Sequence, residues 1–390
     1  MSKKNLAFLV NRFLDGGMET VLVEYLRHLA QQSEYNITLG IALHMGDLEM
    51  YRDRLPQNVH IHYFVRNGIL TRWKRHRLTG RMAKPIKLFD ELFLNPIRRL
   101  LMVWGIGQLS RQNDVIVDFD NSFSSFLKGV KKTKIVFLHS TIRASRGGDP
   151  RLIEKVKRRI TIYDHVVTIS KAMYQEACEL FPNISDRICM IYNAINTRNL
   201  LEEAEKPEAD HRIDIPYILC VTRLEEYPKD VTTLIKAYAI LRSEYGHAEE
   251  LYVISKGDSL QQLQNTATEM GVANDVHFLG FKGNPYPWIK HCRLLVQSSI
   301  FEGLPTAMVE ALLLDKMMVA TDCPTGPKEI LNNGQAGLLT PVGDKEALAK
   351  AMHEALTDKA LQQQMAEGRA AHKRLFTFDY TGKLFAELLK

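Results

Sequence analysis

The chain has 390 residues, of which 45% are hydrophobic and 25% are charged, so the composition excludes a disordered protein. A single hydrophobic core stops growing well below this length, and we therefore expect two globular domains, residues 1–200 and residues 201–375. The net charge of +6 is uneven: residues 1–200 carry 31 Lys and Arg against 18 Asp and Glu (+13), and the remainder carries 20 against 27 (−7). The basic first half predicts an anionic partner, such as membrane phospholipid, a phosphorylated acceptor or nucleic acid.

The chain begins with a pattern of strand, glycine-containing loop and helix. The five apolar residues 6–10 are too few for a signal peptide and predict a strand, and apolar residues at helical spacing over 18–29 predict a helix. Between them, Gly16 and Gly17 would let the backbone approach a phosphate or a sugar closely, although such a pair is also common in simple turns. The Gly-x-Gly-x-x-Gly spacing of dinucleotide-binding proteins is missing here.

The segment 66–104 is basic at its start and apolar at its end. Residues 66–87 contain eight Lys or Arg and no acidic residue, and residues 88–104 repeat apolar side chains at helical spacing, interrupted by Pro96. A basic segment with Trp73, followed by an apolar stripe, can lie in the interface of an anionic bilayer. A solvated loop followed by a helix that faces the core is the equally weighted alternative. Nucleic acid is not expected, since no RNA- or DNA-binding motif is present.

Short apolar runs predict the remaining strands of both halves. They lie at residues 37–43, 59–64, 115–119, 135–138, 166–170 and 188–192 in the first half, and at 217–221, 251–255, 276–280, 294–297, 318–321 and 337–341 in the second. His139 follows the strand 135–138, at the edge of a parallel sheet where ligands bind, although a lone histidine is usually structural. No run reaches the roughly twenty apolar residues of a membrane-spanning helix. The five cysteines lack metal-ligand spacing, so we expect a reducing cytosol, no disulfide and no metal.

Residues 197–214 are polar and acid-rich and are expected to be a linker. After the next strand come Arg223 and Lys229, two cations that could bind an anionic ligand. Surface salt bridges are the alternative role for both side chains.

The stretch 297–330 combines a strand end, a tight turn and a helix that Pro305 opens. The first helical turn leaves backbone N–H groups unpaired, those of Leu304 and Thr306 among them, and so favours an anion. Two carboxylates flank this position: Glu302 precedes the helix and Glu310 lies inside it, and both are suited to sugar hydroxyl groups.

Taken together, these motifs resemble the retaining glycosyltransferases of family 4, whose two glutamates are separated by seven residues, as Glu302 and Glu310 are. The resemblance covers nearly the whole chain and is strongest over 217–343. It implies an α/β protein of the GT-B fold, with two Rossmann-like domains facing across a cleft. Residues 1–200 would form the acceptor-side domain and 201–375 the nucleotide-sugar domain, and a C-terminal helix at 376–390 would return to the first domain.

The resemblance also assigns roles to individual residues. Glu302, His139, Arg223 and Lys229 would be catalytic: Glu302 would position the donor sugar, Arg223 and Lys229 the diphosphate, and His139 would be the cleft histidine. Glu310 would contact the ribose. The other expected donor-binding residues are Gly16, Gly17, Asn193, Gly303, Leu304 and Thr306. Residues 284–289 correspond to the nucleobase pocket of the family. Thr222 and Asp230 replace family glycines beside the two cations, which changes the expected shape of those loops.

The implied reaction is metal-independent transfer of a hexose, with retention, from a nucleotide diphosphate sugar, UDP-sugar being favoured, to a glycan, glycolipid or glycoprotein acceptor. No cofactor is expected beyond the donor substrate. We expect a cytoplasmic protein with peripheral contact to the inner face of the membrane. A nucleotide-sugar 2-epimerase and a non-catalytic, membrane-associated binding subunit are the alternatives. A more distant one is the metal-dependent glycosyltransferase fold, in which Asp118 and Asp120 would form an Asp-x-Asp motif.

Overall fold

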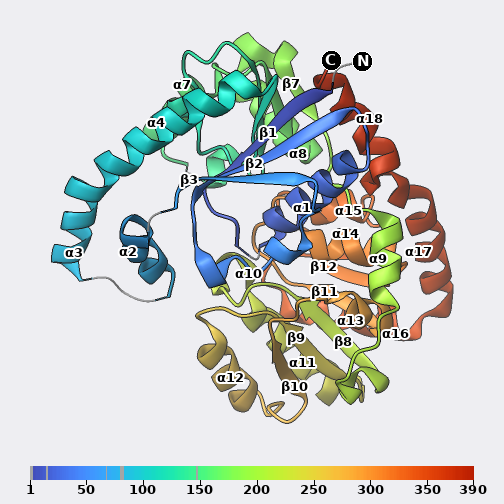
Figure 1. Cartoon of the computed structure of the whole chain (residues 1–390). Helices are drawn as coiled ribbons and strands as arrows, with labels where there is room; N and C mark the ends of the chain where they lie inside the picture. The colour runs from blue at the N-terminus through green and yellow to red at the C-terminus, as the bar shows by residue number, and fades with distance from the viewer. Residues whose placement is uncertain (1–2, 15, 67, 80–82, 146–147) are drawn as a thin grey trace. The chain divides into compact units, whose positions relative to one another are not determined.

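The computed structural model describes residues 3–14, 16–66, 68–79, 83–145 and 148–390. The chain divides into two compact units, each with its own parallel sheet (Figure 1). Unit 1 consists of Met1–Ile169, Met173–Ile191 and Leu384–Lys390, and unit 2 of Ser170–Ala172 and Tyr192–Lys383. The main change of unit, at Ile191, precedes the position near 200 that the sequence suggests.

Unit 1 is a parallel sheet with strand order β3-β2-β1-β4-β5-β6-β7. Its strands are β1 Lys4–Val10, β2 Tyr35–Leu43, β3 Val59–Val65, β4 Val115–Asp118, β5 Thr133–Leu138, β6 His165–Thr168 and β7 Ile188–Met190. Its helices are α1 Gly17–Ala30, α2 Gly68–Thr79, α3 Lys84–Phe89, α4 Asn95–Gln112, α5 Ser124–Leu127, α6 Ile142–Ser145, α7 Pro150–Ile160 and most of α8 Lys171–Leu180.

The end of the chain completes the core of unit 1. Phe385, in helix α18 (Phe378–Leu388), lies with its ring centroid 5.1 Å from Tyr25 and 6.2 Å from Phe8. The Lys4 ammonium donates to the carbonyl oxygens of Leu389 and Lys390, so the two ends of the chain lie side by side (Figure 1). The C-terminal residues therefore return to the first unit, as the resemblance implies.

Helices α3 and α4 are joined by a π-helical turn, Asp90–Leu94, into one long rod (Figure 1). The wider turn lies just before Pro96, whose missing N–H cannot bond the preceding turn of an α-helix. The apolar stripe of the rod does not face the core: Phe93, Leu100 and Trp104 are 60%, 71% and 65% exposed. The core-facing interpretation of this stripe is therefore wrong. A different face packs inward, through Leu94, Arg98, Met102, Gly105, Ile106 and Leu109.

Unit 2 repeats the same architecture, with strand order β10-β9-β8-β11-β12-β13, again all parallel. Its strands are β8 Tyr217–Val221, β9 Glu250–Ile254, β10 Val276–Gly280, β11 Leu294–Gln297, β12 Met318–Thr321 and β13 Leu338–Thr340. Its helices are α9 Thr197–Ala204, α10 Glu226–Lys229, α11 Val231–Ser243, α12 Leu260–Glu269, α13 Tyr286–His291, α14 Thr306–Leu313, α15 Pro327–Ile330, α16 Lys345–Thr357, α17 Lys359–His372 and the first part of α18.

Each strand expected from an apolar run is present in the structure, with ends that differ by at most two residues. Among the helices of the described residues, none combines the length and the apolar character needed to cross a bilayer. Both sheets follow the doubly wound order, in which ligands bind beyond the carboxyl ends of the strands.

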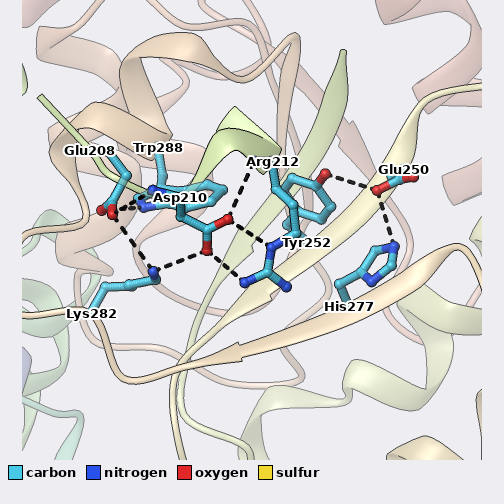
Figure 2. Close-up of polar contacts among 8 residues, drawn as sticks. All are labelled: Glu208, Asp210, Arg212, Glu250, Tyr252, His277, Lys282 and Trp288. Carbon is cyan, nitrogen blue, oxygen red and sulfur yellow. Dashed lines mark hydrogen bonds and ion pairs between the residues drawn. The ribbon is translucent and has the colours of Figure 1, made fainter. Parts of the chain in front are cut away.

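The expected linker 197–214 is folded, because its acidic residues have fixed partners in unit 2 (Figure 2). Glu208 accepts a hydrogen bond of 3.0 Å from the Trp288 indole, and Asp210 is paired with Arg212 (2.5 Å) and Lys282 (3.4 Å). Asn284 donates to the Glu203 carbonyl at 2.9 Å. Asn284 and Trp288, from the segment 284–289 that is expected near a nucleobase, thus hold the residues that lead into β8.

Candidate functional site

The strongest site in unit 2 lies where β8 and β11 end. β11 stops at Gln297, and a loop carries the chain to α14, which Pro305 caps with φ −65°. Glu302 in this loop is 6% exposed. Its carboxylate accepts hydrogen bonds from the Ser299 hydroxyl (2.6 Å) and from the Gln297 amide (3.3 Å). The neighbouring strand end and loop therefore fix Glu302 in one position.

Lys229 forms an ion pair with Glu302. Its ammonium lies 2.7 Å from both carboxylate oxygens, and its side chain is only 13% exposed. The pair joins the loop after β8 to the loop after β11, 73 residues apart in sequence. Both charged groups are largely removed from water, so removal of either one would leave the other buried without a compensating charge. The sequence predicted both residues, and the structure brings them together.

Hydrogen bonds to backbone carbonyl groups hold these two loops against each other. The Ser298 hydroxyl donates to the Asp230 carbonyl at 2.8 Å, and the Ile300 N–H donates to the Pro228 carbonyl at 2.9 Å. Asp230 takes a left-handed conformation (φ 48°) and caps α11 by accepting from the Thr233 N–H. Asp230 therefore supplies the turn that a glycine makes in the family pattern.

A third loop approaches from the end of β12. Thr325 donates its hydroxyl to the carbonyl of Glu302. Gly326 has φ +90°, and a Cβ there would lie 2.6 Å from Pro305 Cδ and 2.9 Å from the Gly303 carbonyl. The close approach requires glycine, and it fixes the turn that precedes α14.

Four of the expected donor-binding residues lie in helix α14 or in the turn before it. Gly303 and Leu304 lie in the turn, Thr306 begins the helix and Glu310 is 5% exposed one turn further on. The first-turn N–H groups and the helix dipole favour an anion at this end of α14. An anionic group and a hydroxylated group can therefore both be held within this part of unit 2.

Arg223 is not drawn into the ion pair. Its side chain is 64% exposed, and its guanidinium lies 3.4 Å from Glu225. The backbone beside it is fixed by Gly257, where a Cβ would lie 2.3 Å from the Leu224 carbonyl oxygen. The role of Arg223 toward a diphosphate stays a prediction.

Asn193, another expected donor-binding residue, also lies in unit 2. Its side chain is 4% exposed, and its side-chain oxygen has no hydrogen-bond partner among the described residues.

The thiols near this site are not suited to nucleophilic catalysis. Burial raises the pKa of Cys220 and of Cys323 to about 12, and the Glu302 carboxylate adds to both shifts. A thiol with such a pKa is protonated near neutrality.

His139 belongs to unit 1, at the carboxyl end of β5. Its Nε2–H donates to the Phe119 carbonyl at 2.8 Å, and its ring stacks on Phe137 at 5.9 Å. Burial lowers the pKa of His139 to about 4, although this hydrogen bond acts in the opposite direction. The ring is therefore neutral at pH 7, with Nδ1 as its acceptor atom.

The loop that contains Gly16 and Gly17 also lies in unit 1 and holds a carboxylate that sequence reasoning missed. Glu19 accepts from the N–H groups of Gly16 (3.2 Å) and Leu14 (3.4 Å), and a Cβ on Gly16 would lie 2.6 Å from that carboxylate. Glu19 follows the loop at the third helical position, the usual place for such a capping acid, and this spacing was readable in the sequence.

Asp118 and Asp120 are occupied by protein donors. Asp118 is fully buried and accepts from the Tyr163 hydroxyl and from the N–H groups of Ser122 and Phe123, and Asp120 accepts from the Asn11 N–H at 2.6 Å. Burial, with the neighbouring Asp120 carboxylate adding to it, raises the pKa of Asp118 to about 7. The described residues contain no cluster of three or more His, Cys, Asp or Glu able to hold a metal ion. The fold is also not that of the metal-dependent class, so the Asp-x-Asp interpretation is wrong.

Comparison with known proteins shows which family the second half of the chain is similar to. Residues 202–372 match the family model described as "Glycosyl transferases group 1", and this segment contains Arg223, Lys229, Glu302 and Glu310. The chain has the GT-B fold, and its second half is similar to the group 1 glycosyl transferases.

Individual relatives are similar over different shares of the chain. A Campylobacter jejuni N-acetylgalactosamine-N,N'-diacetylbacillosaminyl-diphospho-undecaprenol 4-alpha-N-acetylgalactosaminyltransferase is 28% identical over 55% of this chain and 56% of its own length. The chain thus spans about half the length of that relative. The Salmonella typhimurium lipopolysaccharide 1,6-galactosyltransferase is 24% identical over 84% of this chain and 82% of its own. The Anabaena protein HepE, solved with UDP and glucose, shares the fold with a TM-score of 0.76, 18% identity and 99% coverage of both chains.

Proposed function

We propose that the protein transfers a hexose, with retention of anomeric configuration, from a nucleotide diphosphate sugar to a glycan or glycolipid acceptor. The single observation that carries the proposal is the buried pair of Lys229 and Glu302 beside the N-terminus of α14. Lys229 would bind the diphosphate together with Arg223, Glu302 would position the sugar, and Glu310 would bind the ribose. Such a site offers fixed charges to a leaving diphosphate and directional acceptors to hydroxyl groups.

The proposed proton route uses the donor itself. In the proposed reaction the leaving phosphate oxygen would take the acceptor proton. No metal ion or other cofactor is part of this proposal, because Lys229, Arg223 and the end of α14 would supply the positive charge. UDP is the favoured nucleotide, and the complex of HepE with UDP and glucose supports this choice.

The acceptor is proposed to be attached to a membrane lipid. The relative from Campylobacter is named for a diphospho-undecaprenol acceptor and the one from Salmonella for lipopolysaccharide, which supports this class. We further propose that residues 66–104 contact an anionic membrane from the cytoplasmic side. Exposed Leu100 and Trp104 would enter the interface, and the positive charge of residues 66–87 would attract anionic lipid headgroups.

Two alternatives lead to different products. A nucleotide-sugar 2-epimerase would convert the donor without any acceptor, and a non-catalytic subunit would bind nucleotide and form no product. Incubation with UDP-glucose, UDP-galactose and their N-acetylated forms, with and without lipid-linked acceptor, followed by NMR of the products, separates the three. The proposal expects an α-linked product from an α-linked donor, only when acceptor is present. Inverted product, or an epimerised donor in the absence of acceptor, would contradict it.

A further inference from the structure

A basic cavity in unit 1 is not used by the proposed reaction. It has a volume of about 550 Å³ and is lined by Leu48, Gly68, Arg72, Trp73, Arg75 and His76, most of them on helix α2. The cavity belongs to a stretch in which residues 66–87 hold eight cations and no acid.

Helix α2 is fastened to α4 by two other basic side chains. Asp90 in the π-helical turn is 1% exposed. Its carboxylate forms salt bridges with the Lys74 ammonium, at 3.0 Å, and with the Arg98 guanidinium. Arg98 also donates to the Leu70 carbonyl at 2.7 Å, which ties α2 to the rod. Lys74 and Arg98 are thus committed to holding α2 against the rod of α3 and α4.

The two arginines of the cavity have weaker ties. The Arg75 guanidinium lies against Gly46, where a Cβ would be 3.1 Å from it, and 3.7 Å from the fully exposed Asp47 carboxylate, a pair that water screens. The Arg72 guanidinium lies 5.5 Å from the centroid of the Trp73 ring. Two guanidinium groups beside one cavity provide the paired donors that a phosphate group prefers.

We propose that this cavity binds the phosphate of a lipid headgroup, and the inference rests on the membrane contact proposed above. The cavity and the exposed apolar residues of α3 and α4 belong to one group of connected helices, because Lys74, Asp90 and Arg98 join α2 to the rod (Figure 1). A terminal phosphate, which carries more charge and more free oxygen atoms than a phosphodiester, is the group that two arginines bind best. The ligand class is thus a lipid with a phosphomonoester or diphosphate headgroup.

The test measures binding to vesicles without any nucleotide or acceptor. Phosphatidylcholine vesicles contain either phosphatidic acid or phosphatidylserine, at contents adjusted to the same zeta potential. The wild type should partition at least fivefold more strongly into the phosphatidic acid vesicles. Arg72→Gln/Arg75→Gln should lose this preference. The control Lys84→Gln/Lys87→Gln removes the same charge from exposed positions of α3, and it should weaken binding to both vesicle types while keeping the preference.

A wild type without preference at equal surface potential overturns the proposal, and so does a preference that survives in Arg72→Gln/Arg75→Gln. Circular dichroism checks that both variants are folded, since neither removes a group that ties α2 to α4. Inorganic pyrophosphate added as competitor distinguishes the sources of phosphate. Loss of the preference shows that free phosphate is recognised as well, and retention shows that the lipid-anchored group is required. Because the assay needs no sugar transfer, failure of the proposed reaction leaves its outcome unaffected.

Discussion

At the scale of single residues, the pair of Lys229 and Glu302 is the feature on which the account depends. We expect Lys229→Met to lower transfer at least a hundredfold, because one charged group that stabilises a departing anion typically contributes about two to three orders of magnitude. The variant should also lose about 3 kcal/mol of stability, since the Glu302 charge stays buried without its partner. Steady-state assays of UDP release and denaturant unfolding measure the two effects.

The double variant Lys229→Met/Glu302→Gln is the matched control. It removes both charges, so most of the lost stability should return while activity stays low. Activity that recovers together with stability would assign the pair a purely structural role.

A second residue-scale prediction concerns Glu310, which is buried in α14. Glu310→Gln preserves its shape and should weaken nucleotide affinity about tenfold, the loss expected for one charge-assisted hydrogen bond. Calorimetry with UDP and with uracil separates the ribose contribution from that of the base. Equal UDP affinity in the variant and the wild type would remove Glu310 from the ribose site.

His139 gives a pH-dependent prediction. Its folded pKa of about 4 lies below the unfolded value of about 6.5, so the unfolded chain binds the extra proton first. The stability that neutral His139 contributes is therefore complete above pH 6.5 and is lost as the pH falls toward 4, by about 3 kcal/mol. Asp118, with its raised pKa, acts in the opposite direction, so the difference between wild type and His139→Gln is the informative quantity. A difference that does not change between pH 7 and pH 4.5 contradicts this assignment.

Residue types and spacing predict Lys229, Glu302 and Glu310 because short motifs carry them. The capping position of Glu19 was also readable from its spacing, although it was missed. Spacing could not decide whether Arg223 faces a ligand or forms a surface salt bridge, since the direction of a side chain depends on partners that compete locally. Whether His139 and Gly16 share a ligand with Lys229 stays a prediction.

At the scale of elements, the turn before α14 depends on Gly326. Gly326→Ala adds a Cβ 2.6 Å from Pro305 at φ +90° and should cost about 2 to 4 kcal/mol, with weaker UDP binding. Gly334→Ala is the control, because Gly334 has nearly the same φ (+92°) but nothing within 4 Å. It should cost only about 1 kcal/mol and leave UDP binding unchanged. Equal costs in thermal or denaturant unfolding would show that the close contact is not important.

The exposed face of α4 gives another prediction for an element. Leu100→Glu/Trp104→Glu should leave stability within about 0.5 kcal/mol, because both side chains are mostly exposed, and should abolish flotation with anionic liposomes. Sedimentation of both proteins is the control. A wild-type dimer that becomes monomeric in the variant, with no flotation by either protein, would identify this face as a self-association surface instead.

Strands were predictable in both sheets because buried parallel strands are short apolar runs. The rod of α3 and α4 was not fully predictable, since an apolar stripe at helical spacing has the same appearance whether it meets a core or remains exposed. The only sequence feature that accompanies the π-helical turn is Pro96, which does not by itself predict such a turn. The expected linker is ordered because Asn284 contacts Glu203 in α9, and Trp288 and Lys282 contact Glu208 and Asp210 in the segment that follows; these partners are far away in sequence.

At the scale of the whole molecule, the two units divide the charge as the proposed activity requires. The basic first half contains the cavity and the exposed helix, and the acidic second half contains the buried pair of Lys229 and Glu302. The doubly wound order of both sheets was predictable from alternating strands and helices together with the resemblance. The exact point at which the chain passes between the units was not, because it depends on packing rather than composition.

The most direct test of the central claim is thermal unfolding with UDP or GDP in the presence of EDTA. A ligand at about a hundred times its dissociation constant adds about 2.7 kcal/mol to stability, which raises the midpoint measurably. The account predicts that one of the two nucleotides, with UDP expected, stabilises the wild type without metal, and that Lys229→Met loses the effect. If neither nucleotide raises the midpoint, or if Lys229→Met responds as the wild type does, the site in unit 2 does not bind a nucleotide diphosphate as proposed.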